Sequence, residues 1–467
     1  MAMWLDHGQL LYKDLIDLKP PLLFYLYLWI FKLFGWSALS LRWFSLFYSL
    51  AGTVAVFLIG RKLSADKLGL LAAALFAVFS GGPRIEGAGA NAEVFMLLPM
   101  MLGLLFFLYQ DKWGSRALLL AGLFSGAAIM IKQVALFNFL ALAGFLVFES
   151  LQPHNKLWGI KKMAYLLLGC FVVPFLFAIY FLSKGALVYL IEAALFYGLR
   201  NIGPNVGFFA QRTLGIMLTE NSFIWLLALA GSVHLWAAKK SFEQKYLVFW
   251  TAASFLGVYV GGYAFGHYYI QLIPGLCFLS ALSLYYWREL GRSNLFRWSL
   301  TGLVVVLCVI VLSFQYKFYL VYSPDEVSMA KYNSPVNTIA RDLGEKLRQE
   351  TGPDDLIFPR LLYQLPLYSG RLSASKCYLS LGGSYLMDVA DGLVLRRDFR
   401  TRQKMSLIRK ELADFDRSLK DPRTKYVIYL RSAAPPDFAQ VLRGSGYRYD
   451  EELSYPGPGV IVYKRVY

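Results

Sequence analysis

The sequence has few charged residues and few cysteines. Charged side chains make up 16% of its 467 residues and hydrophobic residues 57%, whereas soluble domains average about 25% charged and about 45–50% apolar. This composition excludes an ordinary soluble protein. The four cysteines are scattered along the chain and three lie inside apolar runs, so the sequence indicates neither a disulfide framework nor a metal-ligand spacing.

The chain has a large excess of positive charge, which is spread over short clusters of basic residues. A net charge of +17 would suit a nucleic-acid-binding protein. However, the basic residues lie in short clusters between apolar runs, as in the cytoplasmic loops of membrane proteins. We therefore expect the chain to sit in a lipid bilayer and to have no nucleic acid partner.

Long apolar runs fill the first 320 residues. Ten of them predict membrane-spanning helices, although several are shorter than the roughly 20 residues that a bilayer needs. Together they predict an α-helical polytopic membrane protein. The ten runs are 42–60, 68–82, 93–109, 117–131, 134–149, 163–183, 221–237, 246–264, 268–287 and 298–318.

The loops between these runs alternate in charge. One set contains basic clusters, such as those near Arg61, Lys161 and Lys239, and the other set contains few basic residues. By the positive-inside rule the basic set is cytoplasmic. The run 42–60 then begins on the outer side, so the preceding apolar run 22–34 is expected to lie in the outer interface instead of spanning the membrane.

The composition changes abruptly after about residue 320, where the chain becomes charged and rich in turns. Short strands are predicted at 355–358, 426–430 and 460–463, and amphipathic helices at 335–350, 401–419 and 436–444. We therefore expect a small α/β domain on the outer face. The expected domains are 1–41, a first outer loop with an interfacial helix, then 42–319, a polytopic transmembrane domain, and 320–467, an extracytoplasmic domain.

The stretch 8–21 contains the first candidate site. Asp14 and Asp17 precede Lys19, which stands before two prolines and an apolar run. Proline is favoured in the first turn of a helix, and the free N–H groups there carry a partial positive charge. Lys19 would therefore suit a phosphate, with Asp14 or Asp17 close enough to act as a base. The alternative is a polar loop whose charges are merely solvated.

Three further outer loops can converge with the first. The second loop has Glu86, Asn91 and Glu93 just before a helix, where Asn91 could instead be a simple N-cap. The third, residues 184–220, contains arginines and glutamates. The fourth adds a lone histidine, a residue that is usually structural, together with side chains that can donate hydrogen bonds. These residues are His267, Tyr268, Tyr269 and Gln271.

The motifs in these loops resemble a known family. Tyr12-Lys13-Asp14 and Asp17-Leu18-Lys19-Pro20-Pro21-Leu22 resemble the first outer loop of the protein O-mannosyltransferase-like and aminoarabinose transferase-like glycosyltransferases of the GT-C fold. Asn91-Ala92-Glu93-Val94-Phe95 is similar to their second outer loop. His267-Tyr268-Tyr269-Ile270-Gln271-Leu272-Ile273-Pro274 is similar to the start of a late helix in bacterial members. The resemblance covers most of the chain, and the first-loop motif is its most specific part.

The resemblance implies an inverting glycosyltransferase of a bacterial cytoplasmic membrane. It would move a sugar from a polyprenyl-phosphate donor to a cell-envelope acceptor, which could be a protein, a lipid or a glycan, on the outer face. Lys19 would bind the donor phosphate, and Asp14 or Asp17 would serve as the carboxylate base that an acceptor hydroxyl needs. The metal requirement stays open, with a divalent ion as one option. The expected substrate-binding residues are Tyr12, Glu86, Asn91, Glu93, His267, Tyr268, Tyr269 and Gln271.

One departure from the family pattern matters for the base. In the family the first outer loop opens with an Asp-Glu pair after a first spanning helix, and the sequence printed here has no such pair before residue 8. We expect a further helix ending in that pair to precede Met1. Without it, Asp14 and Asp17 are the nearby carboxylates, and a catalytically inactive family member in envelope assembly becomes the alternative.

A transporter or flippase is a second alternative. Such proteins place polar groups inside their spans, whereas here the polar residues are concentrated in the outer loops. Asn138 is the clearest polar residue inside a predicted span. The distribution therefore favours an enzyme that works at the interface.

Overall fold

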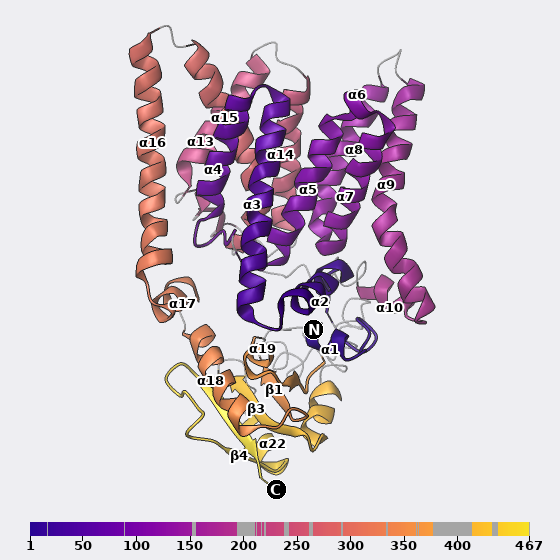
Figure 1. Cartoon of the computed structure of the whole chain (residues 1–467), viewed down its shortest axis with the longest axis vertical. Coiled ribbons are helices and arrows are strands. Elements are labelled where there is room, and N and C mark those ends of the chain that lie inside the picture. The colour runs from indigo at the N-terminus through magenta and orange to yellow at the C-terminus, as the bar shows by residue number, and fades with distance from the viewer. Residues whose placement is uncertain are drawn as a thin grey trace, which may run out of the picture. The chain divides into compact units, whose positions relative to one another are not determined.

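The structure is a computed structural model of the chain (Figure 1). It divides into two compact units. One contains Met1–Leu18, Phe24–Ser40 and Tyr322–Tyr467, and the other contains Lys19–Leu23 and Leu41–Val321. The residues described are 1–467 without 16, 88, 152–155, 194–210, 212, 216, 219–220, 238–241, 261–264, 291–292, 333–334, 361, 363, 377–412, 432–437 and 467.

The larger unit is a bundle of helices (Figure 1). Over their described residues the ten predicted apolar runs coincide largely with helical elements of this unit, because an uninterrupted apolar segment can satisfy its backbone groups in lipid only as a helix. The predicted number of spanning helices stays a prediction. The elements are α3 (Ala38–Leu63), α4 (Asp66–Ser80), α5 (Ala92–Leu108), α6 (Gln110–Trp113), α7 (Ser115–Ile131), η1 (Gln133–Ala135), α8 (Leu136–Ser150), α9 (Lys156–Ser183), α10 (Leu187–Ile191), α13 (Ser222–Ala237), α14 (Phe242–Val260), η3 (Gly266–Gln271), α15 (Ile273–Leu290), α16 (Asn294–Tyr316) and η4 (Lys317–Val321).

The predicted fold class is confirmed. Within the described residues, four segments are long and apolar enough to cross a membrane by length and composition. Others, such as α5 and α7, are apolar but shorter. The four segments are Ala38–Leu63, Gln133–Ser150, Gly159–Ser183 and Thr301–Val321. The chain is therefore an α-helical polytopic membrane protein.

Small residues let the bundle helices approach closely. A Cβ atom added to Gly122 of α7 would lie 2.1 Å from the carbonyl oxygen of Leu166 in α9, and one added to Gly126 would lie 2.2 Å from that of Cys170. Spacing of two small residues four positions apart is typical of tightly packed membrane helices. The contact fixes the position of α7, whose C-terminal end leads into the candidate site.

The smaller unit includes two N-terminal helices, α1 (Ala2–Asp6) and α2 (Pro21–Phe34). The start of α2 belongs to the larger unit, and the part from Phe24 onward belongs to the smaller one. Trp29 and Leu33 of α2 are 65% and 61% exposed, respectively. These apolar side chains suit a lipid interface, and the interfacial position of α2 stays a prediction.

The C-terminal part of the smaller unit is a five-stranded mixed sheet with helices on both faces. The strand order is β2-β1-β3-β5-β4, with β1 parallel to β2 and β3 and with β5 antiparallel to β3 and β4. Alternate strand residues pack on α18 and α19 on one face and on α22 on the other. The elements are α17 (Pro324–Tyr332), α18 (Val336–Glu350), β1 (Leu356–Arg360), α19 (Leu365–Ser369), β2 (Leu372–Ser373), β3 (Thr424–Leu430), α22 (Phe438–Gly444), β4 (Tyr447–Tyr449) and β5 (Val460–Arg465).

The predicted small α/β domain is therefore present. The three expected strands correspond to β1, β3 and β5, and the expected helices at 335–350 and 436–444 correspond to α18 and α22. The expected helix 401–419 lies largely outside the described residues, although 413–420 is helical. The strands β2 and β4 have only two and three residues, too few to produce a recognisable alternation.

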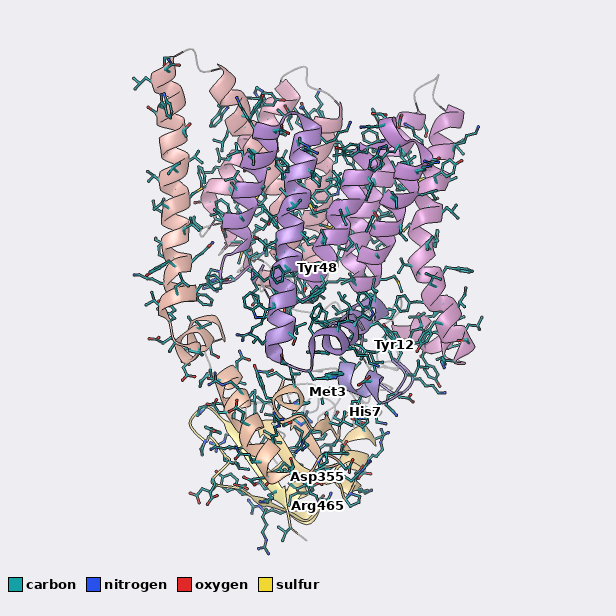
Figure 2. All side chains as sticks on the ribbon, in the orientation of Figure 1. Met3, His7, Tyr12, Tyr48, Asp355 and Arg465 are labelled. Carbon is teal, nitrogen blue, oxygen red and sulfur yellow. The ribbon has the colours of Figure 1, made fainter. Side chains whose placement is uncertain are left out.

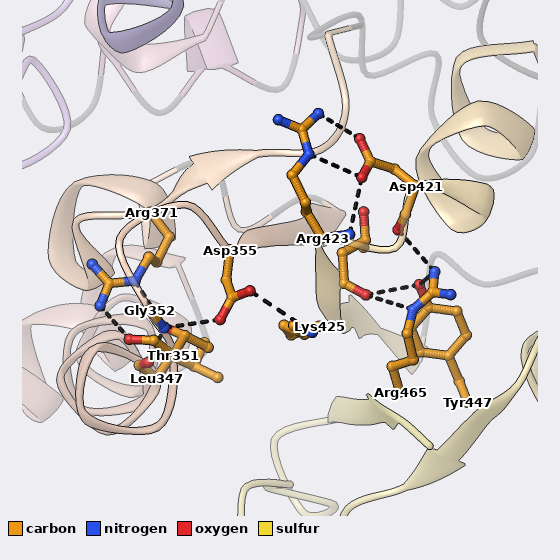
Figure 3. A network of polar contacts seen from close by, with 11 residues as sticks. Leu347, Thr351, Gly352, Asp355, Arg371, Asp421, Arg423, Lys425, Tyr447 and Arg465 are labelled. Carbon is orange, nitrogen blue, oxygen red and sulfur yellow. Dashed lines mark hydrogen bonds and ion pairs between the residues drawn. The ribbon is translucent and has the colours of Figure 1, made fainter. Parts of the chain in front are cut away.

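Polar side-chain contacts link the segments around this sheet (Figure 3). The Arg371 side chain donates from Nε to Thr351 Oγ1 at 2.8 Å. Arg465 donates from Nε to the Thr424 carbonyl oxygen at 3.0 Å and from a terminal nitrogen to the Tyr447 hydroxyl at 2.7 Å. These bonds satisfy the carbonyl group at the start of β3 and two hydroxyl groups near the sheet.

The N-terminal loop contacts the C-terminal part within the smaller unit. Trp4 Nε1 donates to the carbonyl oxygen of Ser373 at 2.9 Å, and Lys376 Nζ donates to Gln9 Oε1 at 2.7 Å. Lys376 Nζ also lies 5.0 Å from the centre of the Trp4 ring. These contacts tie the first loop to the domain after residue 320, and the expected three-way division at 41 and 319 stays a prediction.

Candidate active site

A largely buried ion pair lies in the larger unit. Lys132, directly after α7, donates to a carboxylate oxygen of Glu93 in the first turn of α5. The exposed fractions of the two side chains are 13% and 6%, respectively. A carboxylate is favoured at a helix N-terminus and an ammonium group at a helix C-terminus, so the two helices place opposite charges where each is stabilised.

Two residues of η3 complete this group. Lys132 Nζ lies 3.6 Å from the centre of the Tyr268 ring, a cation–π contact. His267 Nε2 lies 3.8 Å from a carboxylate oxygen of Glu93, and the His267 side chain is 28% exposed. We call Glu93, Lys132, His267 and Tyr268 the Glu93–Lys132 cluster. It joins the ends of α5 and α7 to η3.

The pKa of Lys132 depends on its burial and on the charges near it. Burial lowers the pKa of Lys132, and the carboxylate of Glu93 opposes that shift. The ammonium group of Lys19 lowers the Lys132 pKa further, because like charges disfavour each other. Lys19 itself is exposed and precedes α2. Lys19, the residue predicted to bind the phosphate, is therefore close enough to Lys132 for the two charges to interact.

The first loop holds its carboxylates through backbone hydrogen bonds. Asp14 Oδ2 accepts from the Leu10 N–H at 2.7 Å, and Asp17 Oδ1 accepts from the Leu18 N–H at 2.7 Å. Asp17 is only 8% exposed. Burial raises the pKa of the neighbouring Tyr12 hydroxyl, and the charge of Asp17 adds to that effect. The side chain of Tyr12 is marked in Figure 2. The role of either aspartate as a base stays a prediction.

Strained backbone occurs in two of the predicted site loops. Tyr12 has φ 68° and Glu86 has φ 58°, and these are the non-glycine residues with positive φ among those described. Such conformations are costly for side chains other than glycine and are found disproportionately at functional sites. Both residues are in the predicted substrate-binding set, and the strain supports a role for their loops.

Asn91 orients Glu86. Its Nδ2 donates to Glu86 Oε2 at 2.7 Å. Asn91 is the N-cap residue of α5, as the alternative interpretation expected, but its side chain makes no capping hydrogen bond. A part in substrate binding stays a prediction for both residues.

Tyr269 and Gln271 are buried between helices. The Tyr269 hydroxyl is hydrogen-bonded to the hydroxyl of Tyr259, and Gln271 Nε2 donates to Asn138 Oδ1 at 2.7 Å. Each of the two side chains is 1% exposed. Their predicted contact with substrate is not tested by the structure, which gives both of them partners inside the protein.

Lys132 is the site residue that sequence reasoning missed. It appears in the sequence only as a single basic residue between two apolar runs, on the side expected to be poor in positive charge. A charge kept at such a place usually has a partner or a function, and that was the available signal. Among the described residues no group of three or more His, Cys, Asp or Glu could hold a metal ion.

Comparison with protein families identifies one match. The family model described as "Dolichyl-phosphate-mannose-protein mannosyltransferase" matches residues 18–180, about a third of the chain. The matched region includes Lys19, Glu86, Asn91, Glu93 and Lys132. The family resemblance that the sequence motifs suggest is therefore confirmed over this region. A comparison with curated proteins found no match.

Solved structures with a similar fold cover almost the whole chain. ArnT from Cupriavidus metallidurans bound to undecaprenyl phosphate has a TM-score of 0.65 at 12% identity, covering 100% of this chain and 92% of that one. The oligosaccharyltransferase AglB from Archaeoglobus fulgidus, in complex with an inhibitory peptide and a dolichol-phosphate, has a TM-score of 0.53 at 13% identity, covering 96% of this chain and 66% of that one. At such low identity the likeness shows the fold, which is the GT-C fold.

Proposed function

We propose that the chain is a glycosyltransferase of the protein O-mannosyltransferase-like family that takes a sugar from a polyprenyl-phosphate donor. The observation that carries the proposal is the Glu93–Lys132 cluster, with Lys19 acting on it electrostatically. The similar ArnT structure contains undecaprenyl phosphate, and the matching family model is named for a dolichyl-phosphate-mannose donor. The acceptor is a protein, lipid or glycan on the outer face of a bacterial cytoplasmic membrane.

The cations of the site would act on the leaving phosphate. As the bond between the sugar C1 and the phosphate oxygen breaks, its electrons pass to the phosphate, whose negative charge grows. Lys19 and Lys132 would stabilise that charge, since groups that are positioned before the reaction lower a barrier most effectively. Glu93 holds Lys132 in position and favours its charged form.

The acceptor side requires a base. An acceptor hydroxyl would attack C1 opposite the phosphate, which inverts the anomeric configuration, while its proton passes to a carboxylate. Asp14 and Asp17 are the proposed bases. Each accepts a hydrogen bond from the loop backbone and keeps lone pairs that can take the proton. A member that binds the donor without transferring sugar is the second candidate function.

Release of polyprenyl phosphate from a polyprenyl-phosphate sugar tests the proposal. The full-length protein in lipid vesicles is given the donor and a cell-envelope fraction as acceptor. Lys19→Ala should slow release on the order of 10²-fold, as expected for the loss of a transition-state charge partner. Lys13→Ala is the matched control, since Lys13 is an exposed lysine of the same loop. No release by the wild type, with donor still bound, would favour the inactive-member alternative.

A further inference from the structure

Three polar side chains form a buried network inside the helix bundle. Gln271 Nε2 donates to Asn138 Oδ1 at 2.7 Å, and Asn138 Nδ2 donates to Ser254 Oγ at 2.7 Å. Ser254 Oγ donates in turn to the carbonyl oxygen of Trp250 at 3.1 Å. The exposed fractions are 1% for Gln271, 2% for Asn138 and 0% for Ser254. All the donors run in one direction, so each amide orientation determines the next.

The network connects the two segments that supply the site. Gln271 ends η3, which begins beside His267 and Tyr268. Gln271 Nε2 also donates to the carbonyl oxygen of Val134 at 3.3 Å, and Val134 is in η1, directly beyond Lys132. The hydrogen bond therefore ties the segment that carries His267 and Tyr268 to the segment that carries Lys132.

The backbone of α14 leaves no room for Gln271 to move toward it. A Cβ atom added to Gly257 would lie 2.6 Å from Gln271 Nε2. Real Cβ atoms essentially never lie this close to another heavy atom, so a side chain at position 257 would displace the Gln271 amide. The Gln271 side chain is thus enclosed by α8, η1 and α14.

We propose that Gln271 is a positioning residue for the Glu93–Lys132 cluster. Through Asn138, Ser254 and Val134 it fixes the register of η3 against η1. His267 and Tyr268 are thereby held at their distances from Glu93 and Lys132. The inference rests on the proposed function, because it takes the cluster as the donor-phosphate site, and it replaces substrate contact as the role of Gln271.

Two independent substitutions displace or remove the amide. Gly257→Ala places a methyl group against Gln271 Nε2, while it raises the helix propensity of α14. Gln271→Leu removes the bonds to Asn138 and Val134. Gly144→Ala is the matched control, because an added Cβ there has open space. The readout is equilibrium binding of undecaprenyl phosphate by the full-length protein in lipid nanodiscs, together with its unfolding temperature.

Both substitutions should weaken undecaprenyl phosphate binding about tenfold or more, since small displacements of binding groups are costly, and Gly144→Ala should not. The double variant should lose no more than either single variant, because both act through one side chain. Wild-type binding by folded Gly257→Ala and Gln271→Leu proteins would overturn the positioning role. If the wild type itself does not bind undecaprenyl phosphate, the proposed function fails instead.

A triple variant tests whether the network positions the Glu93–Lys132 cluster or only packs the helices together. In Gln271→Leu/Asn138→Leu/Ser254→Ala every member of the network becomes apolar, and such complete replacement can be nearly neutral for stability. The unfolding temperature should therefore recover, while binding stays weak because the bond to Val134 is still absent. Recovery of both would show that the network only packs the bundle and would overturn the inference.

Discussion

Lys132 Nζ lies 3.6 Å from the centre of the Tyr268 ring, so the lysine is held between an aromatic face and the carboxylate of Glu93. A desolvated cation–π contact contributes about 2 kcal/mol. We expect Tyr268→Phe to bind polyprenyl phosphate nearly as the wild type does, because the ring is retained. Tyr268→Leu should bind about tenfold more weakly or worse. Equal binding by the two variants would show that the ring face is unimportant.

Removing one member of the Glu93–Lys132 pair should destabilise the protein much more than removing both. Lys132→Met leaves a buried carboxylate without its partner, which costs about 3–5 kcal/mol. Glu93→Leu/Lys132→Met removes both charges and should cost much less. Thermal unfolding of the detergent-solubilised protein measures the difference. A double variant less stable than Lys132→Met would contradict the burial that the structure shows.

The orientation of the chain can be tested with cysteines. In a variant whose four native cysteines are replaced, Lys112→Cys should react with an impermeant reagent only after permeabilisation, because its basic loop is expected to be cytoplasmic. Lys420→Cys, in the C-terminal domain, should react from outside intact cells. The reverse labelling pattern would move both the domain and the candidate site to the cytoplasmic face.

The C-terminal domain should lose stability in acid through Asp421. The Arg423 guanidinium lowers the pKa of Asp421 below its ordinary 3.8. The contribution is therefore complete above pH 3.8 and is lost as the pH falls through the lower, folded-state pKa. It should be below about 1 kcal/mol, because the pair lies near the surface. Hydrogen exchange of β3 in the full-length protein should show this loss, and Asp421→Asn should abolish it.

The sequence predicted the helices and the main strands because their signals are local. An apolar run must become a helix in lipid, and β1, β3 and β5 alternate or concentrate apolar residues over at least five positions. Candidate site residues could be named only where a motif is continuous, as around Lys19, and their roles stay predictions. No local pattern indicates the positive φ of Glu86, which depends on the loop around it.

The contacts inside the candidate site could not be predicted, because they also depend on residues that are distant in the sequence. Lys132 forms an ion pair with Glu93, at the start of α5, and Gln271 forms a hydrogen bond with Asn138, in α8. The residues of each pair lie far apart in the chain, and no local sequence pattern indicates that their side chains are in contact. The sequence predicted substrate contact for Gln271, which stays a prediction, but it could not indicate the hydrogen bonds of Gln271 to Asn138 and Val134.

Binding of undecaprenyl phosphate to the full-length protein in nanodiscs tests the central claim most directly. Our account predicts saturable binding that Lys132→Met and Lys19→Ala each weaken at least tenfold, as expected when a charged partner worth about 1.4 kcal/mol or more is lost. The exposed-lysine control Lys13→Ala should bind like the wild type. Equal affinity in all four proteins would contradict the assignment of Lys19 and Lys132 to the donor phosphate.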